Sequence, residues 1–217
     1  MHLVFIVFSG LLAYIIGSFP TSVWLGKHYF KLDLREHGSG NPGATNTFRV
    51  LGKRAGTIVL LGDVFKGALA TTLAVLLLKL DFIYADELIR FKLLFGALAV
   101  LGHIFSIFLN FKGGKGVATL LGMTMAVAPE GAIISIIVFI AVVLVSKYVS
   151  LGSMLGALAF PLTLIALPAL KPDDPVLIVY GCLITALVIW THRKNIMRLV
   201  NGDENKTYLL PRKSNDD

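Results

Sequence analysis

The sequence predicts an all-α integral membrane protein with seven transmembrane helices. Of its 217 residues, 56% are hydrophobic and only 15% are charged. This leaves too few polar side chains to cover a globule in water, because about a quarter of the residues in soluble domains are charged. The apolar residues fall in seven runs, and about 20 helical residues cross a hydrocarbon core. These runs are 3–25, 57–78, 93–111, 117–128, 132–145, 151–170 and 176–190.

The first run is expected to be a mature helix, because it lacks the basic start and small-residue cleavage site of a secretory signal. Gly17-Ser18-Phe19-Pro20 should bend it near its inner half. The fourth and fifth runs are short, and Pro129-Glu130-Gly131 between them predicts a tight turn at the membrane surface. If these two runs form one bent helix, or two re-entrant halves, the number of spans falls.

The basic residues predict the orientation, because loops rich in Lys and Arg stay in the cytoplasm. With the N-terminus outside and the C-terminus cytoplasmic, most of the 20 Lys and Arg residues lie on the inner side. Lys79, Arg90, Lys92 and Lys171 fall outside. The formal net charge of +7 therefore indicates attraction to the anionic inner leaflet rather than to nucleic acid. Residues 1–200 are expected to form one membrane-embedded domain, and 201–217 a polar cytoplasmic tail.

Metal or cofactor chemistry is not expected from this sequence. Its single cysteine, Cys182, excludes an intrachain disulfide and a cysteine-based zinc site. We find no carboxylate pair, no His/Glu ligand cluster and no aspartate-rich signature. Polar residues that are hard to explain structurally gather instead in three segments on the predicted inner side, at 38–49, 112–119 and 192–206.

The first segment is rich in glycine and reads Gly38-Ser39-Gly40-Asn41-Pro42-Gly43-Ala44-Thr45-Asn46, followed by Arg49. Glycines at positive φ let backbone N–H groups approach an anion, so the loop can cradle a phosphate. Arg49 adds a planar fork of donors, while Ser39 can donate a hydrogen bond or act as a nucleophile. An equally weighted alternative is a surface turn that caps the following helix.

The second segment reads Phe111-Lys112-Gly113-Gly114-Lys115-Gly116-Val117-Ala118-Thr119. It is not a nucleotide P-loop, because Leu109 stands where that pattern needs its first glycine, and Gly116 follows the lysine. A glycine-rich, doubly basic helix start remains, and such N-termini bind anions. Positive-inside anchoring is the alternative, which explains the lysines but not the glycines.

The third segment contains His192-Arg193-Lys194-Asn195, then Arg198, Gly202, Glu204 and Lys206. His192 and Asn195 are three residues apart, so on a continuing helix they share one face. A histidine there can move protons at neutral pH. Alternatively, the residues around His192 are only interfacial anchors.

Two charged residues and one histidine lie within the apolar runs. Asp63 and Lys66 are three apart on one helix face and should pair with each other or with the inner loops, since isolated charges in hydrocarbon are costly. His103 is expected to be a buried, hydrogen-bonded structural residue rather than a catalyst.

Taken together, these segments resemble the PlsY family of bacterial acyl-phosphate:glycerol-3-phosphate acyltransferases over nearly the whole chain. The one departure is Ser106, where the family usually has proline. The matching residues are Gly17-Ser18-x-Pro20, Asp33-Leu34-Arg35, Gly38 to Asn46, Arg49, Leu51-Gly52, Asp63-x-x-Lys66-Gly67, Gly102-His103, Phe111 to Thr119, His192-Arg193-x-Asn195, Arg198, Gly202 and Glu204.

The resemblance implies transfer of a fatty acyl group from acyl phosphate to the sn-1 hydroxyl of glycerol 3-phosphate, at the inner face of the bacterial cytoplasmic membrane. It implies no cofactor, no metal and no nucleic acid, and is compatible with a link to an enzyme that makes acyl phosphate. The residues it assigns to catalysis are Ser39, Arg49, Lys115, His192 and Asn195. Those assigned to the substrate phosphate are Gly38, Gly40, Asn41, Gly43, Thr45, Asn46, Lys112, Gly113, Gly114 and Gly116. Those expected to give structural support are Asp63, Lys66, His103 and Glu204.

Acyl phosphate is already activated, so direct transfer needs only alignment and exclusion of water. A substrate phosphate oxygen can then accept the hydroxyl proton, and His192 is the rival general base. A transporter of phosphorylated solutes is the main alternative function, although transporters place their polar site near the membrane midplane. A membrane scaffold protein is the third, and it would not need glycine-rich anion loops.

Overall fold

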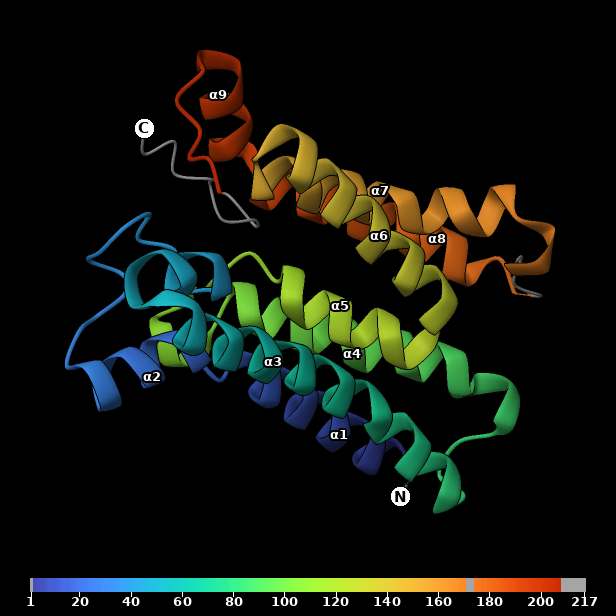
Figure 1. Cartoon of the computed structure of the whole chain (residues 1–217). Helices are drawn as coiled ribbons and strands as arrows, with labels where there is room; N and C mark the ends of the chain where they lie inside the picture. The colour runs from blue at the N-terminus through green and yellow to red at the C-terminus, as the bar shows by residue number, and fades with distance from the viewer. Residues whose placement is uncertain (1, 171–173, 208–217) are drawn as a thin grey trace, which may run out of the picture. The chain divides into compact units, whose positions relative to one another are not determined.

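The computed structural model describes residues 2–170 and 174–207 (Figure 1), and all regular structure within them is helical. The chain divides into two compact units, Met1–Pro129 and Glu130–Asp217. Lys171 and the tail residues 208–217, both included in the predicted topology, lie outside the described residues.

The first unit is a bundle in which α1 packs on α3 and α4, and α5 packs on α3 and α4. Its short α2 lies on α3. The turns η1, Ala85–Glu87, and η2, Ile107–Leu109, flank α4. The helices are α1 His2–Ser18, α2 Thr21–Phe30, α3 Ala44–Lys79, α4 Leu88–Ile104 and α5 Val117–Val127.

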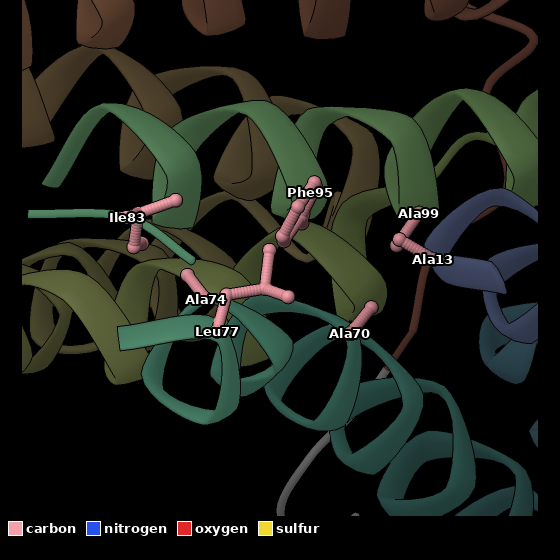
Figure 2. Packing of buried hydrophobic residues seen from close by; sticks show 7 residues of the cluster. All are labelled: Ala13, Ala70, Ala74, Leu77, Ile83, Phe95 and Ala99. Atoms are coloured by element: carbon pink, nitrogen blue, oxygen red, sulfur yellow. The ribbon is translucent and has the colours of Figure 1, made fainter. Parts of the chain in front are cut away.

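Small residues let the helices of this unit approach closely, as is typical of membrane bundles. Figure 2 shows Leu77 of α3 and Phe95 of α4 directed into the space between the two helices, and both are buried. A Cβ on Gly17 would lie only 2.0 Å from the carbonyl oxygen of Ala99. The buried cluster consists of Ala13, Ala70, Ala74, Leu77, Ile83, Phe95 and Ala99.

The first apolar run folds as two helices rather than one. The predicted bend is confirmed, because α1 ends at Ser18 and α2 begins at Thr21 after a turn of 45°. Pro20 occupies the N-cap of α2, where its missing N–H group interrupts no intrahelical hydrogen bond.

Helix α3 corrects the expectation that residues 38–49 form a loop. It begins at Ala44, so Thr45, Asn46 and Arg49 lie on its first turns. Hydropathy marks where a helix is apolar, but the backbone can continue as a helix into polar surroundings. Gly52 at φ 82° kinks α3, which separates these polar turns from the apolar part.

The predicted turn at Pro129-Glu130-Gly131 is displaced in the structure. The break falls at Ala128, and Pro129 is the first residue of α6. Proline is favoured at the first helical position because its fixed φ suits the helix and its absent N–H group would be unpaired there anyway. These three residues therefore start a helix instead of forming the turn.

The second unit contains α6 Pro129–Ser146, α7 Val149–Ala166, α8 Val176–Thr191 and α9 Arg193–Asn201, with a 3₁₀ turn η3 at Pro168–Leu170. α7 packs on α8. A Cβ on Gly152 would lie 2.6 Å from a methyl group of Val143, and one on Gly156 would lie 3.0 Å from the carbonyl of Ser135. These contacts show that the two glycines allow close helix packing in this unit.

Four helical stretches in the described residues are long and apolar enough to cross a membrane: 44–79, 85–109, 129–146 and 149–166. The bent pairs α1–α2 and α8–α9 bring the number to six if each is one span. α5 is apolar but has only 11 residues. The described residues thus confirm an all-helical fold with four to six candidate spans, while the seventh span stays a prediction.

Candidate active site

The glycine-rich turn before α3 is closed by one side chain, Asn46. Its Oδ1 accepts the N–H group of Ser39 at 2.8 Å. Its Nδ2 donates to the carbonyls of Leu34 and His37, both at 3.0 Å. Asn46 is 1% exposed, and both ends of its amide are engaged inside the protein. This residue, expected to contact phosphate, therefore acts as a clamp on the turn.

Two glycines of the turn adopt the backbone expected of them. Gly38 has φ 63° and Gly40 has φ 69°, a region that side chains disfavour. A Cβ on Gly38 would also lie 2.3 Å from Asn46 Oδ1. Ser39 and Arg49 are exposed, so their polar groups can reach a ligand.

An ion-paired carboxylate anchors the chain that leads into the turn. Asp33 accepts hydrogen bonds from the side chain of Arg35, the shortest at 2.7 Å, and lies 3.0 Å from Lys27 Nζ. The bond from Arg35 is the main reason that the pKa of Asp33 lies well below its ordinary value. The same bond raises the pKa of Arg35. Leu34 between them is fully buried, which fixes the start of the turn.

The second segment does not present its amides as the sequence suggested. The N–H groups of Gly113 and Gly114 donate to the carbonyls of Ile104 and His103, at 2.9 and 3.1 Å. These bonds satisfy carbonyls at the end of α4, where intrahelical donors are lacking. The N–H groups of Gly113 and Gly114 are therefore engaged within the protein, and the assignment of these two residues to the substrate phosphate stays a prediction.

The start of α5 supplies such donors instead. Gly116, at φ 81°, is its N-cap, and Leu120 makes the first intrahelical bond back to it. The N–H groups of the preceding turn, from Val117 to Thr119, thus have no acceptor within the helix, and a helix N-terminus attracts anions. Lys112 is exposed and Lys115 is partly buried at this end.

The two glycine-rich segments meet in the first unit. A Cβ on Gly114 would lie 2.7 Å from the carbonyl oxygen of Pro42 and 2.3 Å from His103 Nε2, so only glycine fits here. A small polar pocket lies at this contact. Its lining residues are Ser18, Phe19, Pro20, Thr21, Ser22, Pro42, Asp63, Lys66, His103, Ser106, Leu109 and Gly114.

The two buried charged residues of α3, Asp63 and Lys66, pair with each other as predicted. Lys66 Nζ lies 2.8 Å from Asp63 Oδ1, and their side chains are 7% and 2% exposed. Thr21 donates to the same carboxylate at 2.9 Å, and Lys66 donates to the Phe19 carbonyl at 2.9 Å. His103 is buried and hydrogen-bonded to Thr119, in agreement with the structural role expected for it.

In the second unit, His192 ends α8 and begins α9, which turns by 59°. His192 and Asn195 therefore do not share the face of one continuing helix, because the chain changes direction at the histidine. His192 is 3% exposed, and its Nδ1 lies 2.8 Å from the Val188 carbonyl. Asn195 stays close through its N–H group, which donates to the His192 carbonyl at 2.7 Å.

Glu204 holds Asn195 from the chain that follows α9. Its Oε1 accepts hydrogen bonds from Asn195 Nδ2 at 2.7 Å and from Ser150 Oγ at 2.9 Å. Sequence reasoning missed Ser150, because a serine in the first turn of a helix is ordinarily explained by the helix end. Only its contact with a residue far along the chain reveals it. The predicted supporting role of Glu204 agrees with this arrangement.

Comparison with known proteins places the chain in a family. The family model described as glycerol-3-phosphate acyltransferase matches residues 7–202. A glycerol-3-phosphate acyltransferase of Listeria welshimeri is 46% identical over 202 residues, which covers 93% of this chain and 96% of that protein. One of Enterococcus faecalis is 44% identical over 206 residues, and covers 93% and 91%.

Two solved structures resemble the fold. The crystal structure of PlsY (YgiH), an integral membrane glycerol 3-phosphate acyltransferase, in its glycerol 3-phosphate form has a TM-score of 0.80 and 37% identity, and covers 93% of this chain and 95% of that one. Its lysophosphatidic acid form has a TM-score of 0.78 and 35% identity. Since the family model covers most of the sequence and the relatives match it nearly end to end, the chain belongs to the glycerol-3-phosphate acyltransferase family, as its resemblance to PlsY suggested.

Proposed function

We propose that this enzyme transfers a fatty acyl group from acyl phosphate to the sn-1 hydroxyl of glycerol 3-phosphate, which gives lysophosphatidate and inorganic phosphate. The observation that carries the proposal is the contact of the two glycine-rich segments, where Gly114 meets Pro42. That contact brings Pro42, just before α3, and Gly114, just before α5, to one small polar pocket, while Ser39, Arg49 and Lys115 lie outside its lining.

The phosphate of glycerol 3-phosphate is assigned to basic and N–H donors around this contact. Arg49 and Lys115 supply the cations, and Ser39 supplies a hydroxyl. The first-turn N–H groups of α5 add a helix N-terminus, which suits an anion. Gly38 and Gly40 shape the turn through their positive φ, while Asn41, Gly43, Thr45 and Lys112 are assigned as nearby contacts.

His192 and Asn195 are assigned to order the substrate, on the basis of the family resemblance. Within the second unit, Glu204 and Ser150 hold Asn195. We treat residues 1–200 as one membrane-embedded catalytic domain, and the family match over 7–202 supports this because it runs through both units.

Direct transfer accounts for the chemistry. The glycerol hydroxyl oxygen attacks the acyl carbonyl carbon, the bond from that carbon to the phosphate oxygen breaks, and the phosphate leaves with the electron pair. A substrate phosphate oxygen takes the hydroxyl proton. Cationic and N–H donors stabilise the charge on the leaving group. His192 is the rival base, since a neutral ring that donates from Nδ1 to the Val188 carbonyl carries its lone pair on Nε2.

For the topology we propose seven spans: the α1–α2 pair, α3, α4, α5, α6, α7 and the α8–α9 pair. An odd number puts the two termini on opposite sides, and an N-terminus outside with a cytoplasmic C-terminus keeps both glycine-rich segments inside. The excess of basic residues on that side supports this orientation. The active site would then face the cytoplasm of a bacterium, at its inner membrane.

An assay with the purified protein, acyl phosphate and glycerol 3-phosphate tests the function. Release of lysophosphatidate together with phosphate is expected, whereas acyl thioesters of carrier protein or coenzyme A should not serve as donors. Neither a transporter nor a scaffold protein would release these products. Mass spectrometry of the reacting enzyme should find no acylated Ser39, and a trapped acyl-serine would overturn direct transfer.

Variants test the phosphate site in the same assay. Arg49→Ala and Lys115→Ala should each lower kcat/KM for glycerol 3-phosphate by about ten- to a hundred-fold, as expected for loss of a hydrogen bond to a charged group. Lys53→Ala is the matched control, because Lys53 is an exposed cation on the same helix as Arg49. Near-normal kinetics in both site variants would refute the assignment.

A further inference from the structure

A path of buried polar side chains runs beneath the glycine-rich segments of the first unit. Thr119 Oγ1 and His103 Nδ1 are hydrogen-bonded at 3.2 Å, and the same ring nitrogen lies 3.8 Å from Asp63 Oδ1. Asp63 pairs with Lys66, whose ammonium group donates to the Phe19 carbonyl. One polar path therefore joins α5, α4, α3 and the bend between α1 and α2.

His103 holds the segment 112–116 and the helix that follows it. Its carbonyl accepts the N–H group of Gly114 at 3.1 Å. Its Nε2 lies close enough that a Cβ on Gly114 would be 2.3 Å away. Its Nδ1 contacts Thr119 in the first turn of α5. One residue thus fixes both the middle of the segment and the start of the next helix.

Thr119 is held from two directions. Its hydroxyl faces His103, while a Cβ on Gly67 of α3 would lie 2.0 Å from its carbonyl oxygen. Thr119 is fully buried, so a rotation of the start of α5 would leave polar atoms without partners, which is costly in a dry interior. The direction of the first turn of α5 is therefore set by the polar path as well as by packing.

We propose that Thr119 and His103 are positioning residues for the phosphate of glycerol 3-phosphate. They act through the backbone, since they set the direction in which the first-turn N–H groups of α5 point and thereby the affinity for that phosphate. The Asp63–Lys66 pair on α3 lies beside the ring of His103, with Asp63 Oδ1 3.8 Å from Nδ1. This inference rests on the proposed function, because it assigns the phosphate to the start of α5.

The test uses steady-state kinetics of the full-length enzyme with both substrates varied. Thr119→Val keeps the shape of the side chain and removes its hydroxyl, so the KM for glycerol 3-phosphate should rise about ten-fold, the effect of one mispositioned hydrogen-bonding site. The kcat and the KM for acyl phosphate should stay within about two-fold. Thr119→Ser restores the hydroxyl and should restore the KM.

Thr124→Val is the matched control, because Thr124 is also on α5 but donates to the Leu120 carbonyl of its own helix. It should leave both KM values unchanged. At the other end of the bond, His103→Phe fills the space beside Gly114 without ring nitrogens, whereas His103→Asn keeps a polar atom near Nδ1. The KM for glycerol 3-phosphate should rise more in His103→Phe than in His103→Asn.

A wild-type KM for glycerol 3-phosphate in Thr119→Val overturns the proposal. An equal rise of this KM in Thr124→Val also overturns it. So does a fall in the kcat of Thr119→Val with both of its KM values unchanged. Arg49→Ala and Lys115→Ala, assayed beside these variants, distinguish failure of the positioning role from failure of the proposed phosphate site. If they impair use of glycerol 3-phosphate and Thr119→Val does not, only the positioning role fails. If none of the three has an effect, the proposed phosphate site fails with it.

Discussion

At the residue scale, the clamp made by Asn46 is the sharpest local feature of the site. Asn46→Asp should destabilise the turn, because it replaces the amide nitrogen that donates to Leu34 and His37 with an oxygen facing two carbonyls. The loss should reach about 1 kcal/mol for each missing hydrogen bond, with repulsion in addition. A lower thermal midpoint of the purified protein, together with a loss of activity, checks this expectation.

Thr45→Ala serves as the control for that substitution. Thr45 neighbours Asn46 on the first turn of α3, and its side chain is exposed. Its replacement should leave the thermal midpoint within the range of ordinary surface changes. Equal midpoints for wild type and Asn46→Asp would show that the turn does not depend on the clamp.

The ion pair at Asp33 predicts a dependence of stability on pH. Its pKa in the folded state is below that in the unfolded chain, so its contribution is complete above the unfolded value of about 4 and is lost as the pH falls further. The difference in thermal midpoint between wild type and Asp33→Asn should thus be the same at neutral pH and mildly acidic pH. It should shrink in stronger acid, and an undiminished difference there would contradict the role of the charge.

Some of these side-chain relations can be predicted from sequence, and some cannot. The pairing of Asp63 with Lys66 follows from their spacing of three on a helix, because isolated charges in an apolar run need a partner. The bond between Ser150 and Glu204 depends on chain segments that are 54 residues apart, and no local pattern reports it. The engagement of the Gly113 and Gly114 amides likewise depends on where α4 ends.

At the element scale, glycines set how closely α3 and α5 pack. A Cβ on Gly122 would lie 1.8 Å from the carbonyl oxygen of Val64. Gly122→Ala should therefore push the helices apart and cost about 1–3 kcal/mol of stability, as overpacking usually does. Because α5 begins at the proposed phosphate site, activity should fall as well. Thermal unfolding and the acyltransfer assay measure the two effects.

Gly10→Ala on α1 is the matched control for Gly122→Ala. There the added Cβ would meet the end of the Leu98 side chain at 3.2 Å, which can move. This variant should be close to wild type in both measurements. A Gly122→Ala protein as stable as Gly10→Ala would mean that α3 and α5 are not held in close contact.

The apolar runs predicted the presence of apolar helices better than the residues at which these helices begin and end. The start of α3 at Ala44 was missed because Thr45, Asn46 and Arg49 are polar, although polar side chains do not prevent a helix outside hydrocarbon. The bend at Pro20 was predictable, since proline and a nearby glycine disturb helices in any surroundings. The break at His192 has neither proline nor glycine, so the sequence contains no signal for it. The continuing helix on which His192 and Asn195 would share a face does not form.

At the scale of the whole molecule, the sequence predicted an all-helical membrane enzyme of the right family. Composition and apolar runs were sufficient for the fold class, because lipid leaves a spanning chain few alternatives to the helix. The contact of Gly114 with Pro42 brings together two of the three polar segments that were predicted to lie on the inner side. The number of spans depends on the 11-residue α5 and on the two bent pairs, which apolar length alone does not decide.

The central claim is that the segments around Asn41 and Lys112 lie on the cytoplasmic face and together bind glycerol 3-phosphate. Single cysteines at these two positions, in a Cys182→Ser background, can be labelled with an impermeant maleimide in intact cells and in inverted vesicles. The account predicts labelling of both only in inverted vesicles, slowed at both positions by glycerol 3-phosphate but not by glycerol. Labelling of the two positions from opposite faces, or at rates unaffected by glycerol 3-phosphate, would contradict it.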